Sequence, residues 1–365
     1  MGFKCGIVGL PNVGKSTLFN ALTQTAAAAA ENFPFCTIEP NVGVVPVPDG
    51  RLETCARIGK SAQIIPTQLT FVDIAGLVRG ASQGEGLGNQ FLAHIREVDA
   101  IIHLLRCFED GDVTHVDGRV DPLADAETIE TELMLADLDS AERRIPALAK
   151  RAKGNDEEAR RELALMERAA AVLRDGKPAR TVQLADDERV AFERLGLITA
   201  KPVLYVCNVE EAAAATGNAL SAKVAEKAKA EGVPCVVISA AIESEIAQLD
   251  AEERSMFLEE IGLTETGLSR IIRAGYELLG LVTYFTVGPK EARAWTINKG
   301  TKAPQAAGVI HTDFEKGFIR AETIAYDAFV AHNGEVGAKE AGKARLEGKE
   351  YVVQDGDILH FRFNT

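Results

Sequence analysis

The segment Gly9–Thr17 carries the side chains whose types and spacing most clearly predict a chemistry. It reads Gly-Leu-Pro-Asn-Val-Gly-Lys-Ser-Thr, so Gly9 and Gly14 precede Lys15 and Ser16 with the spacing of a P-loop. Glycines let backbone N–H groups surround phosphate oxygens, and a helix N-terminus adds partial positive charge. Lys15 can then reach the β- and γ-phosphates, and the Ser16 hydroxyl can bind Mg²⁺. We predict that this segment holds a nucleoside triphosphate and that Lys15 is catalytic.

A strand and a helix must position this loop. Phe3–Leu10 is a short apolar run typical of a buried strand, and the residues after Lys15 are typical of a helix, which the alanines at 26–30 extend. Apolar runs at 68–73, 100–105, 201–207 and 233–238 predict further buried strands, and residues 248–279 predict helices. The predicted fold class is α/β, with a P-loop NTPase core of the GTPase-like type.

Two further residues are candidates for the Mg²⁺ shell. Thr37 lies in a proline-containing loop, where P-loop switch proteins use a threonine to complete the shell and to sense the γ-phosphate. Asp73 ends a predicted strand and forms a D-x-x-G pattern with Gly76; its carboxylate can hold Mg²⁺ through water, and the Gly76 N–H can bond the γ-phosphate. A plain Asp-Gly turn is the alternative. The predicted metal ligands are Ser16, Thr37 and Asp73.

The residue after Gly76 bears on the hydrolytic mechanism. Ras-like GTPases place a glutamine there to orient the attacking water, but this chain has Leu77, which cannot hydrogen-bond water. His115, in a polar and glycine-containing segment, is a candidate to place the water instead. From the residues alone, an ordinary surface-loop histidine is the simpler explanation.

Residues 208–211 follow a predicted strand at the point where GTPases carry N-K-x-D. The aspartate of that motif accepts two hydrogen bonds from guanine, and the lysine stem covers the base, whereas here Val209 and Glu211 take those positions. The longer carboxylate of Glu211 does not match the guanine clamp, and Asn208 can pair with the N6/N7 edge of adenine. We therefore predict ATP rather than GTP. The segment that begins with Ser239 and Ala240 resembles the loop whose backbone N–H groups face the purine.

Residues 125–198 predict an inserted helical arm, which divides the nucleotide-binding domain into residues 1–124 and 199–278. This stretch is rich in Ala, Leu, Glu, Asp and Arg, and apolar residues at 138, 141, 145 and 148 and at 163, 166, 170 and 173 follow a heptad spacing. Gly154-Asn155-Asp156 predicts the turn of an antiparallel hairpin with coiled-coil packing. Basic residues cluster near the tip, and either a docking surface or a face balanced by nearby acids explains them: Arg143, Arg144, Lys150, Arg151 and Lys153.

Residues 279–365 predict a small α+β domain of the β-grasp kind. Residues 281–287 and 292–298 predict strands around a Gly-Pro turn, residues 314–325 a helix, and residues 351–363 a terminal hairpin at Asp355-Gly356. The segment AWTINKGTKAPQAAGVIHTDFEKGFIRAE resembles the TGS domain of translation-linked proteins. Such a sheet could present basic residues to RNA, although they could equally be scattered solvating side chains: Lys299, Lys302, Lys316 and Arg320.

Composition limits the function classes. The chain has 365 residues and a net charge of −14, which argues against a general polyanion-coating protein. No apolar run approaches the ~20 residues of a membrane span, and the N-terminus lacks the form of a signal peptide. The six cysteines form no C-x-x-C pair and mostly lie in apolar runs, which predicts reduced, buried thiols. We expect a cytoplasmic protein with no membrane partner, and a monomer.

Taken together, these motifs resemble those of the Obg-like ATPases of the YchF type, which are P-loop proteins of the GTPase superfamily. The resemblance rests on NFPFCTIEPN, DIAGLVRGAS and NVEE, besides the P-loop, and runs through nearly the whole chain. It implies Mg²⁺-dependent binding and hydrolysis of ATP, with Ser16 and Thr37 on the metal, Asn208 near adenine and His115 assisting hydrolysis. It also implies that the residues of the P-loop contact the phosphates: Asn12, Val13, Gly14, Lys15, Ser16 and Thr17.

The prediction from the sequence is therefore a nucleotide-controlled ATPase switch that binds ATP and ADP and engages the ribosome or another RNA-containing partner. Its function would be to modulate translation or a stress response. One alternative is a GTPase translation factor that binds guanine despite the altered N-x-x-E. The other is an interaction protein that signals by ATP occupancy with negligible turnover.

Overall fold

The computed structural model describes residues 3–30, 41–74, 87–110, 119–154 and 156–364. Five of the residues named above, Thr37, Gly76, Leu77, His115 and Asn155, lie outside them. The chain forms two compact units, of which the first comprises Met1–Thr25, Thr37–Gly43 and Thr70–Ile271, and the second Ala26–Cys36, Val44–Leu69 and Ile272–Thr365. Among the described residues, no helix is both long and apolar enough to cross a membrane.

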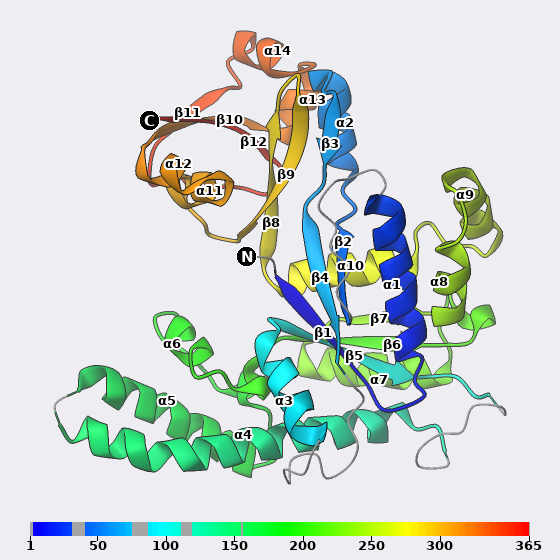
Figure 1. Ribbon diagram of the computed structural model, residues 1–365, viewed down its shortest axis with the longest axis vertical. Helices are drawn as coiled ribbons and strands as arrows, with labels where there is room; N and C mark the ends of the chain where they lie inside the picture. Colours follow the sequence, from blue (N-terminus) through cyan, green and yellow to red (C-terminus); the bar gives the residue numbers. More distant parts are fainter. Residues whose placement is uncertain (1–2, 31–40, 75–86, 111–118, 155, 365) are drawn as a thin grey trace. The chain divides into compact units, whose positions relative to one another are not determined.

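The first sheet has the strand order β2-β4-β1-β5-β6-β7 (Figure 1). The pairs β1–β4, β1–β5, β5–β6 and β6–β7 are all parallel. Strand order reverses at β1, and in such sheets ligands bind beyond the carboxyl ends of the strands at this reversal. The strands are β1 (Lys4–Val8), β2 (Val42–Pro46), β4 (Gln68–Asp73), β5 (Ala100–Arg106), β6 (Val203–Asn208) and β7 (Cys235–Ile238). The predicted α/β fold with apolar strands is confirmed.

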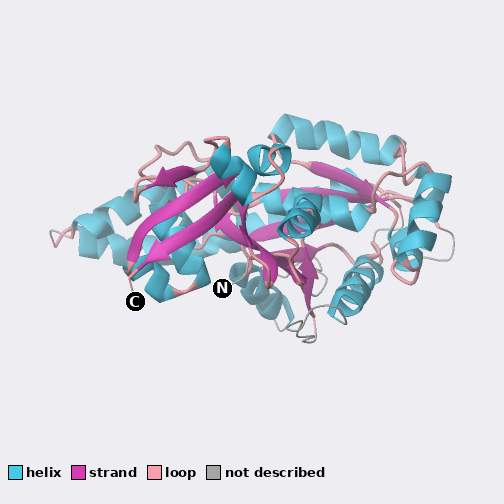
Figure 2. Cartoon of the chain, turned by 90° about the horizontal axis from the view of Figure 1, so that it is seen from above, coloured by secondary structure: helices cyan, strands magenta, loops and turns pink. Residues whose placement is uncertain are grey.

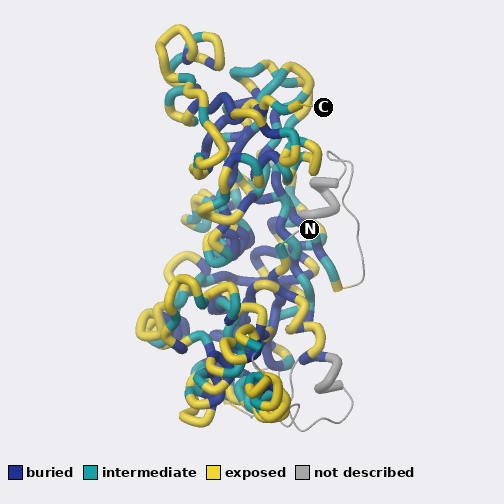
Figure 3. Tube along the Cα trace, turned by 90° about the vertical axis from the view of Figure 1, so that its left-hand side faces the viewer, coloured by how far each residue is buried: buried dark blue, intermediate teal, exposed yellow. Residues whose placement is uncertain are grey.

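Helices cover both faces of this sheet, as its burial requires. Every residue of β5 and β6 is buried, which is typical of parallel strands with both faces covered. Buried stretches of the chain are dark blue in Figure 3. The helices are α1 (Lys15–Ala30), α3 (Leu87–Glu97), α7 (Ala219–Glu231), α8 (Ala240–Ile246), α9 (Ala251–Glu260) and α10 (Gly267–Leu278). The alanine run does extend α1, as predicted from helix propensity.

The predicted helical arm is present as α4 (Pro122–Ala152) and α5 (Glu157–Arg174), which lie side by side in Figure 1. Asp156 caps α5 by accepting a hydrogen bond from Ala159 N at 2.9 Å, which confirms the predicted start of this helix. The arm is more than a bare hairpin, because η2 (Ala179–Thr181), α6 (Arg189–Glu193) and η3 (Ile198–Ala200) follow it and add Phe192 and Leu195 to its core.

The basic cluster of the arm is largely paired within the arm itself. Arg143 bonds Asp139 at 2.8 Å, and Arg144 bonds Glu162 at 3.1 Å. Arg151 bonds Asp156 at 3.0 Å. These contacts favour the explanation of a solvated helix face balanced by neighbouring acids over that of a cationic docking surface.

The second unit contains a mixed sheet with the order β11-β10-β12-β8-β9-β3. Figure 2 shows its long strands in magenta with helices beside them. Its strands are β3 (Gln63–Ile65), β8 (Leu281–Val287), β9 (Glu291–Asn298), β10 (Phe318–Ala325), β11 (Arg345–Glu347) and β12 (Asp357–Phe363). Its helices are α2 (Gly50–Gly59), α11 (Ala303–Ile310), α12 (Thr312–Lys316), α13 (Tyr326–Ala331) and α14 (Glu335–Glu340).

Three predictions for this region need correction. The predicted helix at 314–325 is mostly strand β10, which pairs with β12. The predicted terminal hairpin is wrong, because β12 pairs with β10 and β8 and not with residues 351–353. Residues 44–69, placed by sequence in the nucleotide-binding domain, belong to the second unit, where Leu52 and Cys55 of α2 pack into its core.

Candidate functional site

The loop between β1 and α1 has the backbone conformation that the P-loop pattern predicts. Asn12 and Gly14 adopt positive φ angles of 64° and 91°. A Cβ atom on Gly14 would lie 2.3 Å from Asn208 Nδ2, so glycine is needed both for its conformation and for the close approach of β6. Helix α1 starts directly at Lys15, and Leu18 N donates to Gly14 O at 3.0 Å. The loop therefore ends on a helix N-terminus, where a phosphate is stabilised.

Lys15 and Asp73 form an ion pair at the carboxyl ends of the central strands. Asp73 ends β4, which pairs with β1, and its backbone N–H donates to Asn41 O at 2.8 Å. Their side chains are only 13% and 16% exposed, so the pair is partly shielded from water. The residue predicted to contact phosphate thus touches the residue predicted to hold the metal.

The described residues at this point fit the Mg²⁺ that the fold implies. The Ser16 hydroxyl and the Asp73 carboxylate are hard oxygen donors, and Mg²⁺ is usually held by one or two protein oxygens together with substrate phosphates. Ser16 is exposed at the start of α1, and Lys15 already places a cation beside Asp73. Thr37, the third predicted ligand, lies outside the described residues.

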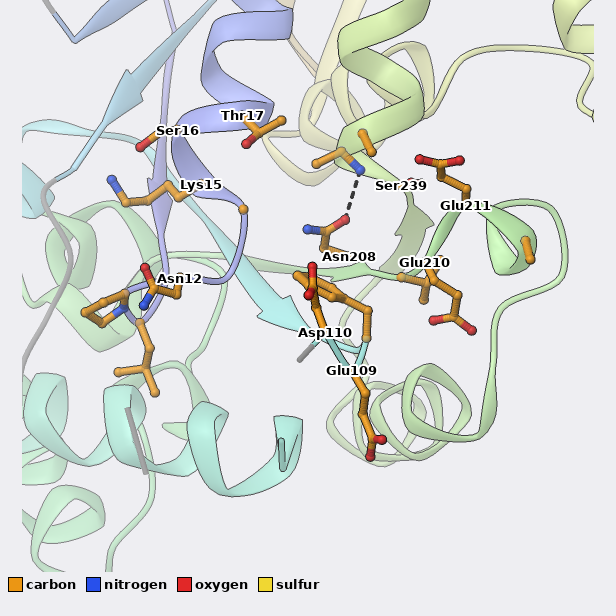
Figure 4. A pocket seen from close by; sticks show the side chains of 18 residues that line it. Asn12, Lys15, Ser16, Thr17, Glu109, Asp110, Asn208, Glu210, Glu211 and Ser239 are labelled. Atoms are coloured by element: carbon orange, nitrogen blue, oxygen red, sulfur yellow. Dashed lines mark hydrogen bonds between the residues drawn. The ribbon is translucent and has the colours of Figure 1, made fainter. Parts of the chain in front are cut away.

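A pocket of about 1020 Å³ joins the P-loop to the ends of β5, β6 and β7. This volume lies at the upper end of the range for small-molecule sites. In Figure 4, Lys15 and Ser16 lie on one side, Glu210 and Glu211 on the other, and Asn208 between them. The lining combines the predicted P-loop and base-end residues, including Asn12, Gly14, Lys15, Ser16, Thr17, Asn208, Val209, Glu211, Ser239 and Ala240. Val13 is buried behind the loop.

Asn208 connects the P-loop to the turn after β7. Its Nδ2 donates to Val13 O at 2.9 Å, and its Oδ1 accepts from Ala240 N at 2.9 Å, the dashed line in Figure 4. Both ends of the amide thus have backbone partners, so the predicted two-point pairing with adenine would require Asn208 to give up or share these bonds. Pairing of Asn208 with adenine stays a prediction, while its role in holding the two loops together is a property of the structure.

The base end of the pocket has an apolar floor and an acidic rim. Val209 is buried, and its N–H donates to Ile238 O at 2.8 Å, which fixes the start of the N-x-x-E segment against β7. Glu211 begins a short 3₁₀ helix and is exposed at the rim. The Ser239 hydroxyl is buried and has no hydrogen-bond partner among the described residues, so it is available to a ligand that enters here.

Sequence reasoning missed the residues that follow β5. Phe108, Glu109 and Asp110 line the pocket although they belong to no recognised motif. The rule that ligands bind beyond the carboxyl ends of parallel strands could have found them, since β5 lies between β1 and β6. Glu210 also lines the pocket, and its Oε2 accepts from Asn218 Nδ2 at 2.8 Å.

Behind the base end, three cysteines lie close together at the carboxyl ends of β5 and β6 and in β7. The Sγ atoms of Cys207 and Cys235 are 3.7 Å apart. A hydrogen bond with Cys107, together with burial, raises the pKa of Cys207 and outweighs the opposing effect of its hydrogen bond with Cys235. The pKa of the Cys235 thiol is raised too, so the thiols of Cys207 and Cys235 stay protonated. All five cysteines in the described part of the chain are free, as predicted, and all but Cys235 are buried.

Two family models match separate parts of the chain. Residues 4–137 match a family model described as 50S ribosome-binding GTPase. Residues 281–364 match the model YchF-GTPase_C, described as a protein of unknown function (DUF933).

Comparisons with individual proteins cover the full length. The chain is 61% identical to the ribosome-binding ATPase YchF of Haemophilus influenzae, and both chains are covered completely. It is 55% identical over 367 residues to the protein of the same name from Bacillus subtilis, again with complete coverage of both. A solved structure of the Schizosaccharomyces pombe YchF GTPase superposes with a TM-score of 0.88 at 38% identity, covering 99% of this chain and 98% of that one.

Proposed function

Since the chain belongs to the YchF family of ribosome-binding ATPases, we propose that it binds ATP with Mg²⁺, hydrolyses it to ADP and phosphate, and binds the ribosome. One observation carries the enzymatic part of this proposal. A single pocket connects Lys15 and Ser16 of the P-loop to the N-x-x-E segment at residues 208–211, so one nucleotide spans both motifs. Val209 and Glu211 line the base end in place of the lysine and aspartate of a guanine site, which supports adenine.

The proposed chemistry is transfer of the terminal phosphoryl group to water. When the nucleotide binds, Lys15 leaves Asp73 and contacts the phosphates instead, where it stabilises the charge that develops on them. Asp73, released from Lys15, and the Ser16 hydroxyl would hold Mg²⁺, which would neutralise the negative charge of the phosphate oxygens. The N-terminus of α1 adds its partial positive charge to the same oxygens.

Other roles rest on the family resemblance. We propose that Thr37 completes the metal shell and that Gly76 contacts the γ-phosphate. We also propose that His115 places the attacking water, because Leu77 cannot hydrogen-bond it. The helical arm and the second unit are the proposed ribosome-binding parts, with the second unit as a domain of the TGS kind. A cytoplasmic location follows from such a partner.

A competition experiment on the full chain tests the base preference. A fluorescent ATP analogue is bound in Mg²⁺ and displaced by unlabelled ATP or GTP; we expect displacement by ATP at about tenfold or more lower concentration. Lys15→Ala is expected to abolish binding and turnover, and Lys4→Ala, an exposed lysine on β1, serves as the matched control. Displacement by GTP at the lower concentration would show a preference for guanine and would support a GTPase, the activity in the name of the Schizosaccharomyces pombe protein.

Co-sedimentation of the same chain with ribosomes, with and without ATP, tests the partner. We expect the protein in the ribosomal pellet and faster single-turnover hydrolysis when ribosomes are present. Turnover that stays negligible in both conditions would instead support signalling by ATP occupancy alone.

A further inference from the structure

Arg106 is a buried cation at the end of β5 that none of the recognised motifs explains. It is 1% exposed and is among the largest fully buried side chains in the described chain. Its Cα pairs in register with that of Asn208 on β6, so it lies beside the residue that connects the P-loop to the base end. A buried charge is costly unless hydrogen bonds compensate it, which makes the partners of this guanidinium informative.

The guanidinium contacts two residues of the pocket wall that follow it in the chain, Phe108 and Asp110. Its Nε donates to Phe108 O at 3.1 Å, and one terminal nitrogen donates to Asp110 O at 3.5 Å. Its Cζ atom lies 4.6 Å from the centroid of the Phe108 ring, within cation–π distance. Arg106 therefore restrains both the backbone and the aromatic ring of this short segment.

The restrained segment lines the pocket, whereas Arg106 lies behind it. Phe108, Glu109 and Asp110 line the pocket beside Asn208 and Glu211, and Arg106 is absent from the described lining residues. A half-buried phenyl ring in a pocket offers a flat face for stacking a purine. Any effect of Arg106 on a ligand must pass through this ring or its backbone.

The same segment is also tied to the base end from its other side. Cys107 N donates to Asn208 O at 2.8 Å, and Asn218 Nδ2 donates to Cys107 O at 2.6 Å. The same Asn218 amide nitrogen donates to Glu210 at 2.8 Å. The wall and the acidic rim are thus held in one hydrogen-bonded frame, of which Arg106 is the only cationic member that we find in the described residues.

We propose that Arg106 is a positioning residue for the purine base: it fixes Phe108 as the stacking surface of the pocket and sets the path of the wall up to Asp110. This inference rests on the proposed function, because it assumes a purine nucleotide in the pocket. A planar guanidinium can bond two carbonyls and lie on a ring at once, and a lysine ammonium cannot. Lysine is therefore not expected to replace it fully.

Binding of two ligands to the full chain separates base positioning from damage to the fold. We compare the Kd values of Arg106→Lys, Arg106→Gln and the parent chain for two ligands. These are ATP and inorganic tripolyphosphate, which has the phosphates but no base. We expect the Kd for ATP to rise about tenfold, more for Gln than for Lys, and the Kd for tripolyphosphate to change less than about twofold. Arg143→Lys, at an exposed arginine of the arm, is the matched control.

Phe108→Leu keeps the proposal falsifiable if the Arg106 variants fold poorly, because Phe108 is only half-buried. We expect Phe108→Leu to raise the Kd for ATP but not the Kd for tripolyphosphate. In a double variant that combines both substitutions, we expect Arg106→Gln to raise the Kd for ATP little further. Unchanged ATP affinity in Phe108→Leu, or equal losses for both ligands in the Arg106 variants, would overturn the proposal.

The parent chain shows which claim has failed. If it binds ATP no better than tripolyphosphate, the purine site of the proposed function is absent. If it prefers ATP and the Arg106 variants keep that preference, only the present inference is wrong.

Discussion

At the scale of single residues, Asn208 is the side chain on which the shape of the site most depends. Its amide donates to the Val13 carbonyl and accepts from the Ala240 N–H. Its Nδ2 also occupies the space that a Cβ atom at position 14 would need. A side chain with a donor at one end and an acceptor at the other is required, and Asn is the smallest that supplies both.

Asn208→Asp tests this requirement. The substitution replaces the Nδ2 donor with an oxygen that faces Val13 O, and it adds a buried negative charge, so we expect the affinity for ATP to fall by about tenfold or more, in line with the ~1–3 kcal/mol cost of a buried unsatisfied group. Isothermal titration measures the affinity and thermal unfolding the stability. Asn298→Asp, at an exposed residue ending β9, is the control. Unaltered ATP binding would show that the two loops hold their positions without the amide.

At the scale of elements, Glu322 connects two strands and a helix of the second unit. It lies on β10 and pairs with Arg362 on β12. Its carboxylate also forms an ion pair with the Lys339 ammonium of α14, at 3.0 Å. The hydrogen bond from Lys339, and then that from Arg362, lowers the pKa of Glu322 below its usual value. The charged carboxylate therefore favours the folded state. This contribution is complete above the unfolded-state pKa and is lost as the pH falls through the lower folded-state pKa.

Glu322→Gln should remove this pH dependence. At pH 7 we expect a modest loss of stability, under about 1 kcal/mol because solvent screens the ion pairs. The difference between the parent and the variant should shrink as the pH falls below about 4.5, where the unfolded carboxylate gains its proton. Urea midpoints between pH 3 and 7 measure this, with Glu340→Gln on α14 as the control. A difference that grows on acidification would contradict the assigned sign.

The elements also show where sequence reasoning succeeds and fails. The strands of the first sheet were predictable because a buried parallel strand is apolar on both faces, as in β5 and β6. Strand β10 was not, since Arg320, Ala321 and Glu322 are good helix formers and pairing with β11 and β12 overrides that propensity. A turn does form at Asp355-Gly356, but the expected hairpin across it fails because β12 pairs with β10 and β8 instead.

The candidate site follows the same division. The P-loop was predictable because its chemistry lies in one contiguous segment, Gly9–Thr17, and the geometry at Gly14 agrees with it. The wall after β5 was not, because Phe108 belongs to the site only through the neighbourhood of β5 and β6. Arg106 lay further out of reach, since nothing in a sequence shows that a charged residue in an apolar strand packs on a ring two residues later.

At the scale of the whole molecule, the pocket lies entirely within the first of the two compact units. A ligand stabilises the structure that binds it, by about 2.7 kcal/mol at a concentration 100 times Kd. Hydrogen exchange with ATP and Mg²⁺ should therefore slow at amides of β5, β6 and α7, by up to about 100-fold where exchange requires unfolding of this unit, while β10 and β12 change little.

Lys15→Ala is the control for this measurement, because it should show no protection at any of these strands. Equal protection of β6 and β12 by ATP would show that the two units unfold as one cooperative block, and the independence assumed here would be wrong.

The second unit is not continuous along the chain, and its order of synthesis has a consequence. Its sheet takes β3 from residues 63–65, and its core takes α2 from residues 50–59, yet β12, at residues 357–363, lies in the interior of the sheet between β10 and β8. During translation, about 290 residues are synthesised after α2 and β3 before β12 is available to complete the sheet. Contacts so distant in sequence form slowly and leave apolar surface exposed meanwhile. Folding of this unit is therefore expected to follow that of the nucleotide-binding unit, whose last strand ends at residue 238.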